Sequence, residues 1–209
     1  SRIASVAHAV VVLGLNVVKG LTLCATAFDM MRNAGMNELW RHSLGVAMTA
    51  HILGTKAAMK NPEEVFVAGL LHDIGKVVLY VKWPDVGQQI TTVTRNTSRP
   101  LMDTEQELFE VTHADVGGWL ASAWHLPTSL REPILHHHTP AAAQDAKLQT
   151  AIVHVADVLV KGLACGNPGD DLVPPLSRQA WDLVGLDAQS LAHCLTQATE
   201  EFQTIDDYL

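Results

Sequence analysis

The residues of this chain best suited to chemistry are an adjacent histidine and aspartate, His72-Asp73, which lie inside the apolar run GLLHDIGK at 69–76. One imidazole nitrogen and two carboxylate oxygens form a mixed donor set that suits hard or borderline divalent metals. Further histidines and one aspartate occur before and after the pair, at His42, His113, His137, His138 and Asp157. The order H, HD, H, HH, D predicts a metal site assembled from separate segments of the chain.

The segment around His72-Asp73 has two interpretations. On a helical wheel at about 100° per residue, the pair shares one side with Gly69 and Lys76, so this side is either a solvated face or part of an internal site. Gly69 favours the second, because a glycine inside a helix costs about 1 kcal/mol against alanine and indicates close approach of another element. Lys76 either binds an anionic oxygen or is simply solvated.

The segment 147–163 is predicted to be the most strongly apolar helix, with one narrow polar stripe. Between residues 150 and 161, its polar side chains are Thr150, His154, Asp157 and Lys161. Such a helix is nearly surrounded by protein, so Asp157 faces either a thin strip of water or an internal polar site. A buried ionised carboxylate needs a cation or hydrogen-bond donors to offset its desolvation.

The remaining histidines divide into candidates and bystanders. His42 and His51 lie on opposite sides of one predicted helix, so at most one joins the site, and the small residues that follow His42 favour it. His113 begins a helix and is either a ligand or an ordinary histidine near a helix end. Three successive histidines, 136–138, cannot all face one point, so one of them is a bystander. No role is assigned to His8, His125 and His193.

Composition narrows the class of protein. The chain has 209 residues, 48% hydrophobic and 17% charged, which indicates a globular domain. A formal net charge of -8 argues against a nucleic-acid backbone as the main partner. No segment reaches the roughly 18 uninterrupted apolar residues of a membrane span. The three cysteines are far apart and lack C-x-x-C spacing, so we expect neither a disulfide framework nor a zinc knuckle. This cysteine usage predicts a location in the reducing cytoplasm.

Helical start and stop signals recur along the chain and strand signals are poor, which predicts an all-α domain. One helix should start at Pro62, after Asn61, and carry the His72-Asp73 pair. Other helices are predicted over 3–13, 17–31, 37–59, 103–110, 113–124, 128–138 and 147–163, with two more after residue 177. We expect at most one short helix between 83 and 101, where Pro, Gly and Asn recur, and a loop over 166–175.

Several phrases of the sequence resemble the HD superfamily of metal-dependent phosphohydrolases, and more closely its HDOD branch. They are LWRHS (39–43), FVAGLLHD (66–73), HADVG (113–117) leading to WHLP (124–127), and HHTP (137–140). The HDOD branch is a bacterial all-helical module that serves as an output or regulatory domain in signalling proteins. The related HD-GYP phosphodiesterases carry DGxGYP after their paired histidines, whereas TPAAA (139–143) stands here, so cyclic di-GMP hydrolysis is not implied.

The resemblance implies a helical bundle with a metal site at its centre. Residues 1–35 would be the remnant of an N-terminal helical subdomain, 36–165 the metal-binding core, and 166–209 a loop and helices packed on it. The chain would be a fragment that lacks further N-terminal helices, with a receiver or other sensory domain expected upstream. Many HDOD domains have lost metal ligands, but this chain keeps a full set. The implied ligands are His42, His72, Asp73, His113, His137, His138 and Asp157.

Two functions follow as expectations. In the first, one or two divalent ions act in phosphate-ester hydrolysis, with Asp73 and Lys76 as catalytic residues and a phosphorylated small molecule or nucleotide as substrate. Iron or manganese is favoured, with zinc, nickel or magnesium as alternatives. In the second, the domain is a catalytically silent signalling module that binds other proteins through its helical surface and holds a structural or vestigial metal. A third interpretation treats the histidines as incidental.

Overall fold

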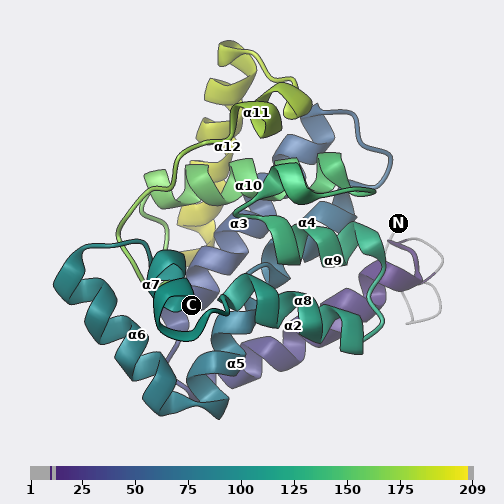
Figure 1. Cartoon of the computed structure of the whole chain (residues 1–209). Helices are drawn as coiled ribbons and strands as arrows, with labels where there is room; N and C mark the ends of the chain where they lie inside the picture. The colour runs from purple at the N-terminus through teal and green to yellow at the C-terminus, as the bar shows by residue number, and fades with distance from the viewer. Residues whose placement is uncertain (1–9, 11–12, 207–209) are drawn as a thin grey trace.

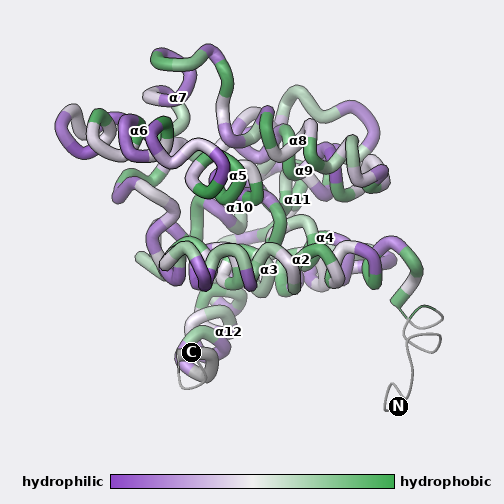
Figure 2. Tube along the Cα trace, turned by 90° about the horizontal axis from the view of Figure 1, so that it is seen from below, coloured by the Kyte–Doolittle hydropathy of each residue, from purple (hydrophilic) through white to green (hydrophobic). Residues whose placement is uncertain are grey.

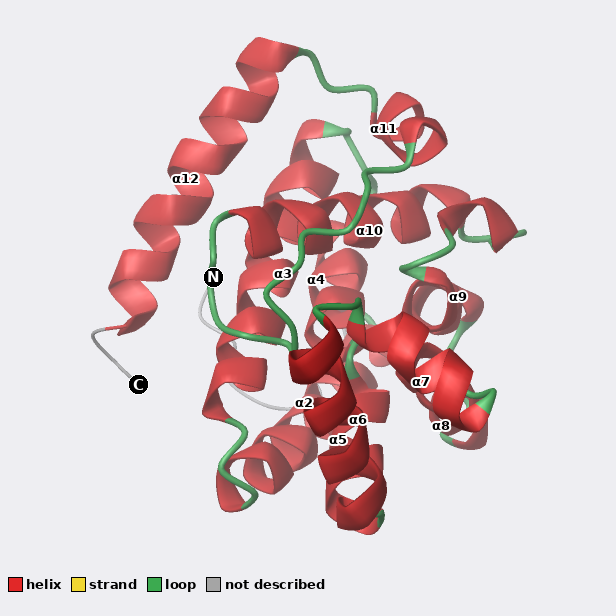
Figure 3. Ribbon diagram, turned by 60° about the vertical axis from the view of Figure 1, so that its left-hand side comes forward, coloured by secondary structure: helices red, strands yellow, loops and turns green. Residues whose placement is uncertain are grey.

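Helices joined by short loops form this molecule in the computed structural model, which describes residues 10 and 13–206. No strand occurs among these residues, as Figure 3 shows, and the predicted all-α fold is confirmed. The predicted helix over 3–13 lies outside the described residues, apart from Val10 and Leu13. In chain order the elements are α2 (Leu15–Asn33), α3 (Asn37–Lys56), α4 (Pro62–Leu71), α5 (Ile74–Lys82), α6 (Pro84–Thr97), α7 (Leu101–Phe109), α8 (His113–Ala123), α9 (Thr128–His136), the 3₁₀ turn η1 (Pro140–Ala142), α10 (Lys147–Gly162), α11 (Arg178–Val184) and α12 (Ala188–Asp206).

The helices pack in two groups around a central apolar core. Helices α2, α3 and α4 contact one another and form one layer, and α5, α8 and α9 lie against it (Figure 2). Helix α10 runs through the middle of the molecule and packs on α3, α4 and α9 (Figure 1). The core therefore forms where α3, α4 and α10 meet, from fully buried side chains such as Val46, Leu53, Leu71, Ile152 and Val155.

Helices α3 and α4 approach closely because small residues face each other between them. A Cβ added at Gly69 would lie 2.9 Å from the Cα of Ala47, so only glycine fits there without displacing α3. The predicted reason for Gly69, close approach of another element, is confirmed. This contact brings the end of α4, and the His72-Asp73 pair after it, against the helix that carries His42.

Local sequence signals explain where several helices begin. Pro62 starts α4 at the position where a missing N–H costs nothing, with two glutamates in the first turn. Thr112 and Asp115 form a reciprocal capping box at the start of α8, in which each side chain satisfies a backbone N–H of the other. This cap fixes the first residue of α8, which is His113.

Two expectations about local structure are wrong. The segment 83–101 holds the 14-residue helix α6, because Pro84 acts as an N-terminal starter and Gly87 packs against the Tyr80 ring rather than ending the helix. The His72-Asp73 pair does not lie inside one helix, since α4 ends at Leu71 and α5 begins at Ile74. Asp73 precedes α5 at the N-cap position, where its side chain makes no capping hydrogen bond and instead accepts from Nζ of Lys76.

None of the described helices is both long and apolar enough to cross a membrane.

Candidate metal centre

The side chains predicted as ligands converge from five parts of the fold on one buried point. His42 comes from α3, Asp157 from α10 and His113 from the first turn of α8. The two adjacent pairs follow helix ends, since His72-Asp73 connects α4 to α5 and His137-His138 comes after α9. All of them are at most 2% exposed except His138, which is half-buried.

One set of donor atoms lies between α3, the α4–α5 junction and α10. The Nε2 atom of His42 is 3.1 Å from Oδ1 of Asp157, and Nε2 of His72 is 3.9 Å from the same oxygen. One ligand atom from each of the three residues falls within 4.8 Å of the others, a spacing that could hold a metal ion. We refer to His42, His72 and Asp157 as the first donor set.

A second set is made of histidines alone. The Nε2 atoms of His113 and His138 are 3.0 Å apart, and His137 completes a trio whose ligand atoms also lie within 4.8 Å of one another. We refer to His113, His137 and His138 as the second donor set. The bystander expected among the three successive histidines is His136, which none of these groups includes.

The carboxylate of Asp73 stands between the two sets and turns one oxygen toward each. Its Oδ2 lies 3.3 Å from Nε2 of His72 and 3.8 Å from Nε2 of His42. Its Oδ1 lies 3.3 Å from Nε2 of His113 and 3.7 Å from Nε2 of His137. This is the placement that a carboxylate shared by two cations needs.

Several donor atoms at this point are buried and have no hydrogen-bond partner among the residues the structure describes, namely Nε2 of His42, His72 and His137 and Oδ1 of Asp73. The Nδ1 atoms of His72 and His137 lie 2.7 and 2.9 Å from the carbonyls of Gly69 and Ile134. An Nδ1–H that donates to a carbonyl leaves the lone pair on Nε2, which is the tautomer a metal ligand needs. Buried polar groups without partners are uncommon, so these atoms fit a bound cation.

The carboxylates of the centre are ionised at neutral pH. Burial alone would raise the pKa of the Asp73 carboxyl, but the His72 imidazole and the Lys76 ammonium outweigh it and hold that pKa well below its ordinary value. His42 does the same for Asp157. Burial would lower the pKa of His72 and of His113, but Asp73 and Glu105 outweigh it and raise the pKa of these two rings. Burial lowers the pKa of His137 well below its usual range and that of His138 to about 3, so both rings are neutral.

Glu105 belongs to the centre and was missed from the sequence. Its side chain is fully buried in α7, and Oε2 accepts hydrogen bonds from Nδ1 of His113 at 2.6 Å and from the His113 backbone N–H at 2.8 Å. The bond fixes the ring so that Nε2 faces the other ligands, as outer carboxylates do in metal sites. The sequence carries no signal that separates Glu105 from its neighbours Glu107 and Glu110.

His154 links the second donor set to the following loop. Its Nδ1–H donates to the His137 carbonyl at 2.7 Å, and its Nε2 accepts from the Ser177 backbone N–H at 3.0 Å. The polar stripe predicted on α10 therefore faces inward, with Thr150, His154 and Asp157 all buried. His154 holds the backbone of a candidate ligand and is not one itself.

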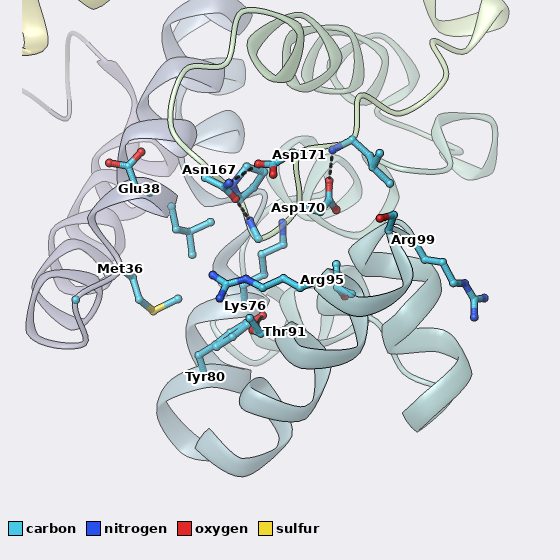
Figure 4. Close-up of a pocket in the computed structure, with 17 residues that line it drawn as sticks. Met36, Glu38, Lys76, Tyr80, Thr91, Arg95, Arg99, Asn167, Asp170 and Asp171 are labelled. Atoms are coloured by element: carbon cyan, nitrogen blue, oxygen red, sulfur yellow. Dashed lines mark hydrogen bonds between the residues drawn. The ribbon is translucent and has the colours of Figure 1, made fainter.

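Lys76 is buried rather than solvated. Only 5% of it is exposed, and its Nζ donates to Oδ2 of Asp73 at 2.8 Å. The lysine also lines a cleft of about 610 Å³ between α5, α6, the start of α3 and the loop 167–172 (Figure 4). Lys76 thus stands between that cleft and the donor sets.

The other histidines that the structure describes belong to neither donor set. His51 is half-buried on the same helix as His42 and packs its ring edge-on against Phe66, 6.3 Å between centroids. His8 lies outside the described residues.

Comparison with known proteins places this geometry in a family. The family model described as "HDOD domain" matches residues 1–140, which contain every predicted ligand except Asp157. A protein of Treponema pallidum (strain Nichols), described as uncharacterized, is 25% identical over 145 residues. That match covers 69% of this chain and 28% of the relative, so the chain spans about a quarter of the length of that relative.

Solved structures share the fold. An HDOD domain protein of unknown function from Geobacter sulfurreducens is 26% identical with a TM-score of 0.78, and the match covers all of this chain and 76% of that one. A Marinobacter aquaeolei VT8 protein, provisionally named as a signal transduction protein, is 19% identical with a TM-score of 0.74, covering all of this chain and 48% of that one. A Shewanella amazonensis SB2B protein, provisionally named as a phosphohydrolase, is 19% identical with a TM-score of 0.59, covering 94% and 77%.

Proposed function

Because the chain belongs to the HDOD domain family, we propose that it is a signalling domain whose centre binds two divalent cations and hydrolyses a phosphate ester. The observation that carries the proposal is the position of Asp73, whose two carboxylate oxygens face two different groups of buried histidine nitrogens. The provisional name of the Shewanella structure supports the reaction class.

His42, His72 and Asp157 would hold one ion, His113, His137 and His138 the other, and Asp73 would be shared. Mixed histidine and carboxylate donors favour iron or manganese. Zinc or nickel binds such sites more tightly, so either can occupy them in the purified protein. When bound, divalent ions polarise a phosphate ester and neutralise the charge that develops on it.

The chain's own residues would position the ester and its charge. Lys76 reaches the centre from the cleft side, and its ammonium would bind a non-bridging phosphate oxygen. Burial lowers the pKa of this amine, but Asp73 raises it by more, so Lys76 is cationic at neutral pH. Glu105 would hold His113 in place through its hydrogen bond.

Elemental analysis of the purified protein tests the metal centre. We expect about two metal equivalents, both lost in Asp73→Asn, and one lost in His42→Gln or His138→Gln because each removes a ligand of one set. His136→Gln is the matched control, since this neighbouring histidine belongs to neither set, and it should keep both. Less than one equivalent in the wild-type protein after incubation with Mn²⁺ or Fe²⁺ would refute the centre.

Turnover of phosphate monoesters and diesters with added Mn²⁺ or Fe²⁺ tests the reaction. Lys76→Met removes the contact to the ester and also the ion pair with Asp73, so it should lose most of the activity. Metal content equal to that of the wild type would then assign the loss to the contact with the ester. A protein that binds metal and hydrolyses no ester of the panel would contradict the enzymatic part.

In that case the second candidate stands, a catalytically silent signalling module with a structural metal. One observation favours it, the near-complete burial of the donor sets behind Lys76. The Marinobacter structure named for signal transduction supports the same alternative.

A further inference from the structure

The cleft beside Lys76 has the size and the walls of a small-molecule site. Its volume of about 610 Å³ lies within the range of ligand pockets. Met36 and Leu39 line one side, Lys76 lies at the inner end, and α6 forms another side (Figure 4). The loop 167–172 closes it and is fixed to α3 by a hydrogen bond from the Asn167 N–H to the Glu38 carbonyl, 3.2 Å.

Helix α6 turns a polar stripe toward this cleft. Thr91, Thr94 and Arg95 line it, and their spacing of three and four residues places them on one helix face. Ser98, the residue after the helix, also lines the cleft. A helix that packs on a protein usually turns its apolar face inward. Helix α6 buries Ile90 and Gly87 against the protein and turns its polar face toward the cleft, so hydroxyl and guanidinium groups are available there.

The hydroxyl of Thr94 is buried and has no hydrogen-bond partner within the described part of the chain, although the residue lines the cleft. The other threonines of α6 satisfy their hydroxyls on the carbonyl four residues earlier, as Thr91 does with Gly87 and Thr97 with Val93. Thr92 does the same with Gln88. Thr94 alone among the threonines of this helix keeps a buried donor for another molecule.

The positive charge left over in the cleft belongs to Arg95. Its side chain extends across the cleft toward the side lined by Met36 and Tyr80 (Figure 4), and it has no ion-pair or hydrogen-bond partner among the residues the structure describes. Of two carboxylates that line the cleft, Asp170 is neutralised by Lys161 at 2.7 Å, whereas Asp171 accepts from the neutral Asn167 side chain at 2.7 Å and keeps its negative charge.

From these contacts we infer that the cleft binds a phosphate ester of nucleotide size. Arg95 and the Thr94 hydroxyl hold the phosphate, directed toward Lys76 and the donor sets, and the uncharged part lies against Met36 and Leu39. This assignment names the substrate class of the proposed phosphohydrolase. Hydrolysis of the bound ester rests on the proposed function, whereas binding in the cleft requires no metal and can be tested separately.

Isothermal titration with the full chain in EDTA tests the site, with AMP, GMP, CMP and UMP as probes. At least one nucleotide should give a saturable heat, and its nucleoside should bind about tenfold or more weakly, because charge-assisted hydrogen bonds to the phosphate are lost. Arg95→Gln should weaken nucleotide binding by a similar factor. Arg178→Gln on α11 is the matched control, since that arginine is exposed away from the cleft, and it should bind as the wild type does.

Thr94→Val separates a binding role from a structural one. It should weaken nucleotide binding several-fold while leaving the melting temperature of the free protein unchanged or higher, because a buried hydroxyl without a partner does not stabilise the fold. Lower stability with unchanged binding would assign Thr94 to the fold and contradict the inference.

Absence of binding by all four nucleotides, equal binding of nucleotide and nucleoside, or normal binding in Arg95→Gln would each overturn the cleft assignment. Failure of the proposed function looks different: nucleotides bind, Arg95→Gln weakens them, and no ester is hydrolysed. Conversely, if Arg95→Gln and Thr94→Val hydrolyse the ester as fast as the wild type does, the metal-dependent activity stands and the cleft is not its substrate site.

Discussion

Replacing Gly75 with alanine should force α8 away from α5 and pull the second donor set out of position. Gly75 lies in the first turn of α5, two residues after Asp73, where the backbones of the two helices touch. A Cβ at this position would lie 1.9 Å from the His113 carbonyl oxygen and 2.8 Å from the Gly117 nitrogen. Both are backbone atoms, so the clash cannot be relieved by turning a side chain.

The expected magnitude follows from these distances. Relief of the contact requires a shift of roughly 1 Å in a close-packed interior, and overpacking of this kind costs about 1–3 kcal/mol or more. Because the clash is with backbone atoms, the cost lies at the upper end of that range, about 3 kcal/mol. The better helix propensity of alanine offsets about 1 kcal/mol. We therefore expect the free energy of unfolding to fall by about 2 kcal/mol. Coordination bonds tolerate only about 0.2 Å, so His113 should be lost as a ligand.

Urea unfolding and metal content after dialysis measure the two effects. Gly162→Ala is the matched control, because a Cβ at this exposed residue at the end of α10 meets nothing within 4 Å. That variant should be as stable as the wild type or more stable by up to about 1 kcal/mol, with full metal content. A Gly75→Ala protein that unfolds within about 0.5 kcal/mol of the wild type and keeps both metals would refute the close approach of α5 and α8.

Three further outcomes are expected. Glu105→Gln should keep the helical circular dichroism spectrum and bind metal about 10–100-fold more weakly, because the neutral amide holds His113 less firmly; unchanged affinity would exclude a positioning role. In the folded protein the pKa of His138 is lowered from 6.5 to about 3, so below pH 6.5 the unfolded chain binds a proton that the folded chain does not, and the metal-free protein loses stability as pH falls. Between pH 6.5 and 5 the free energy of unfolding of the wild type should fall by about 1–2 kcal/mol more than that of His138→Gln. Parallel plots of unfolding free energy against pH would contradict the lowered pKa. Gly166→Ala, at φ +67° with a Cβ 2.4 Å from the His42 nitrogen, should lower the melting temperature; an unchanged melting curve would mean that the loop does not rest on α3.

The candidate ligands could be located from the sequence because each is an unusual residue for its surroundings. Asp157 is a carboxylate on a nearly all-apolar helix, and His72-Asp73 interrupts an apolar run, so burial of either requires a partner. The resemblance to HDOD sequences supplied the grouping, and the structure brings the side chains together. Their role as metal ligands stays a prediction until an ion is measured.

Other features depend on tertiary contacts that the sequence does not express. Glu105 is one of several glutamates on a helix, and only the packing of α7 near the start of α8 turns it toward His113. The length of helix α6 was underestimated because Gly87 is typical of a helix end. In the fold, the absence of a side chain at Gly87 makes room for the Tyr80 ring. Loop and helix signals were both present there, and packing decided between them.

The break between α4 and α5 explains how two adjacent residues serve one centre. Within one continuous helix, His72 and Asp73 would stand about 100° apart on the same broad side. At the junction, Nε2 of His72 and Oδ2 of Asp73 come within 3.3 Å. The other adjacent pair, His137-His138, also follows the end of a helix, whereas the isolated candidates His42, His113 and Asp157 lie within helices. The adjacent candidate donors therefore lie at helix junctions, and the single candidate donors lie within helices.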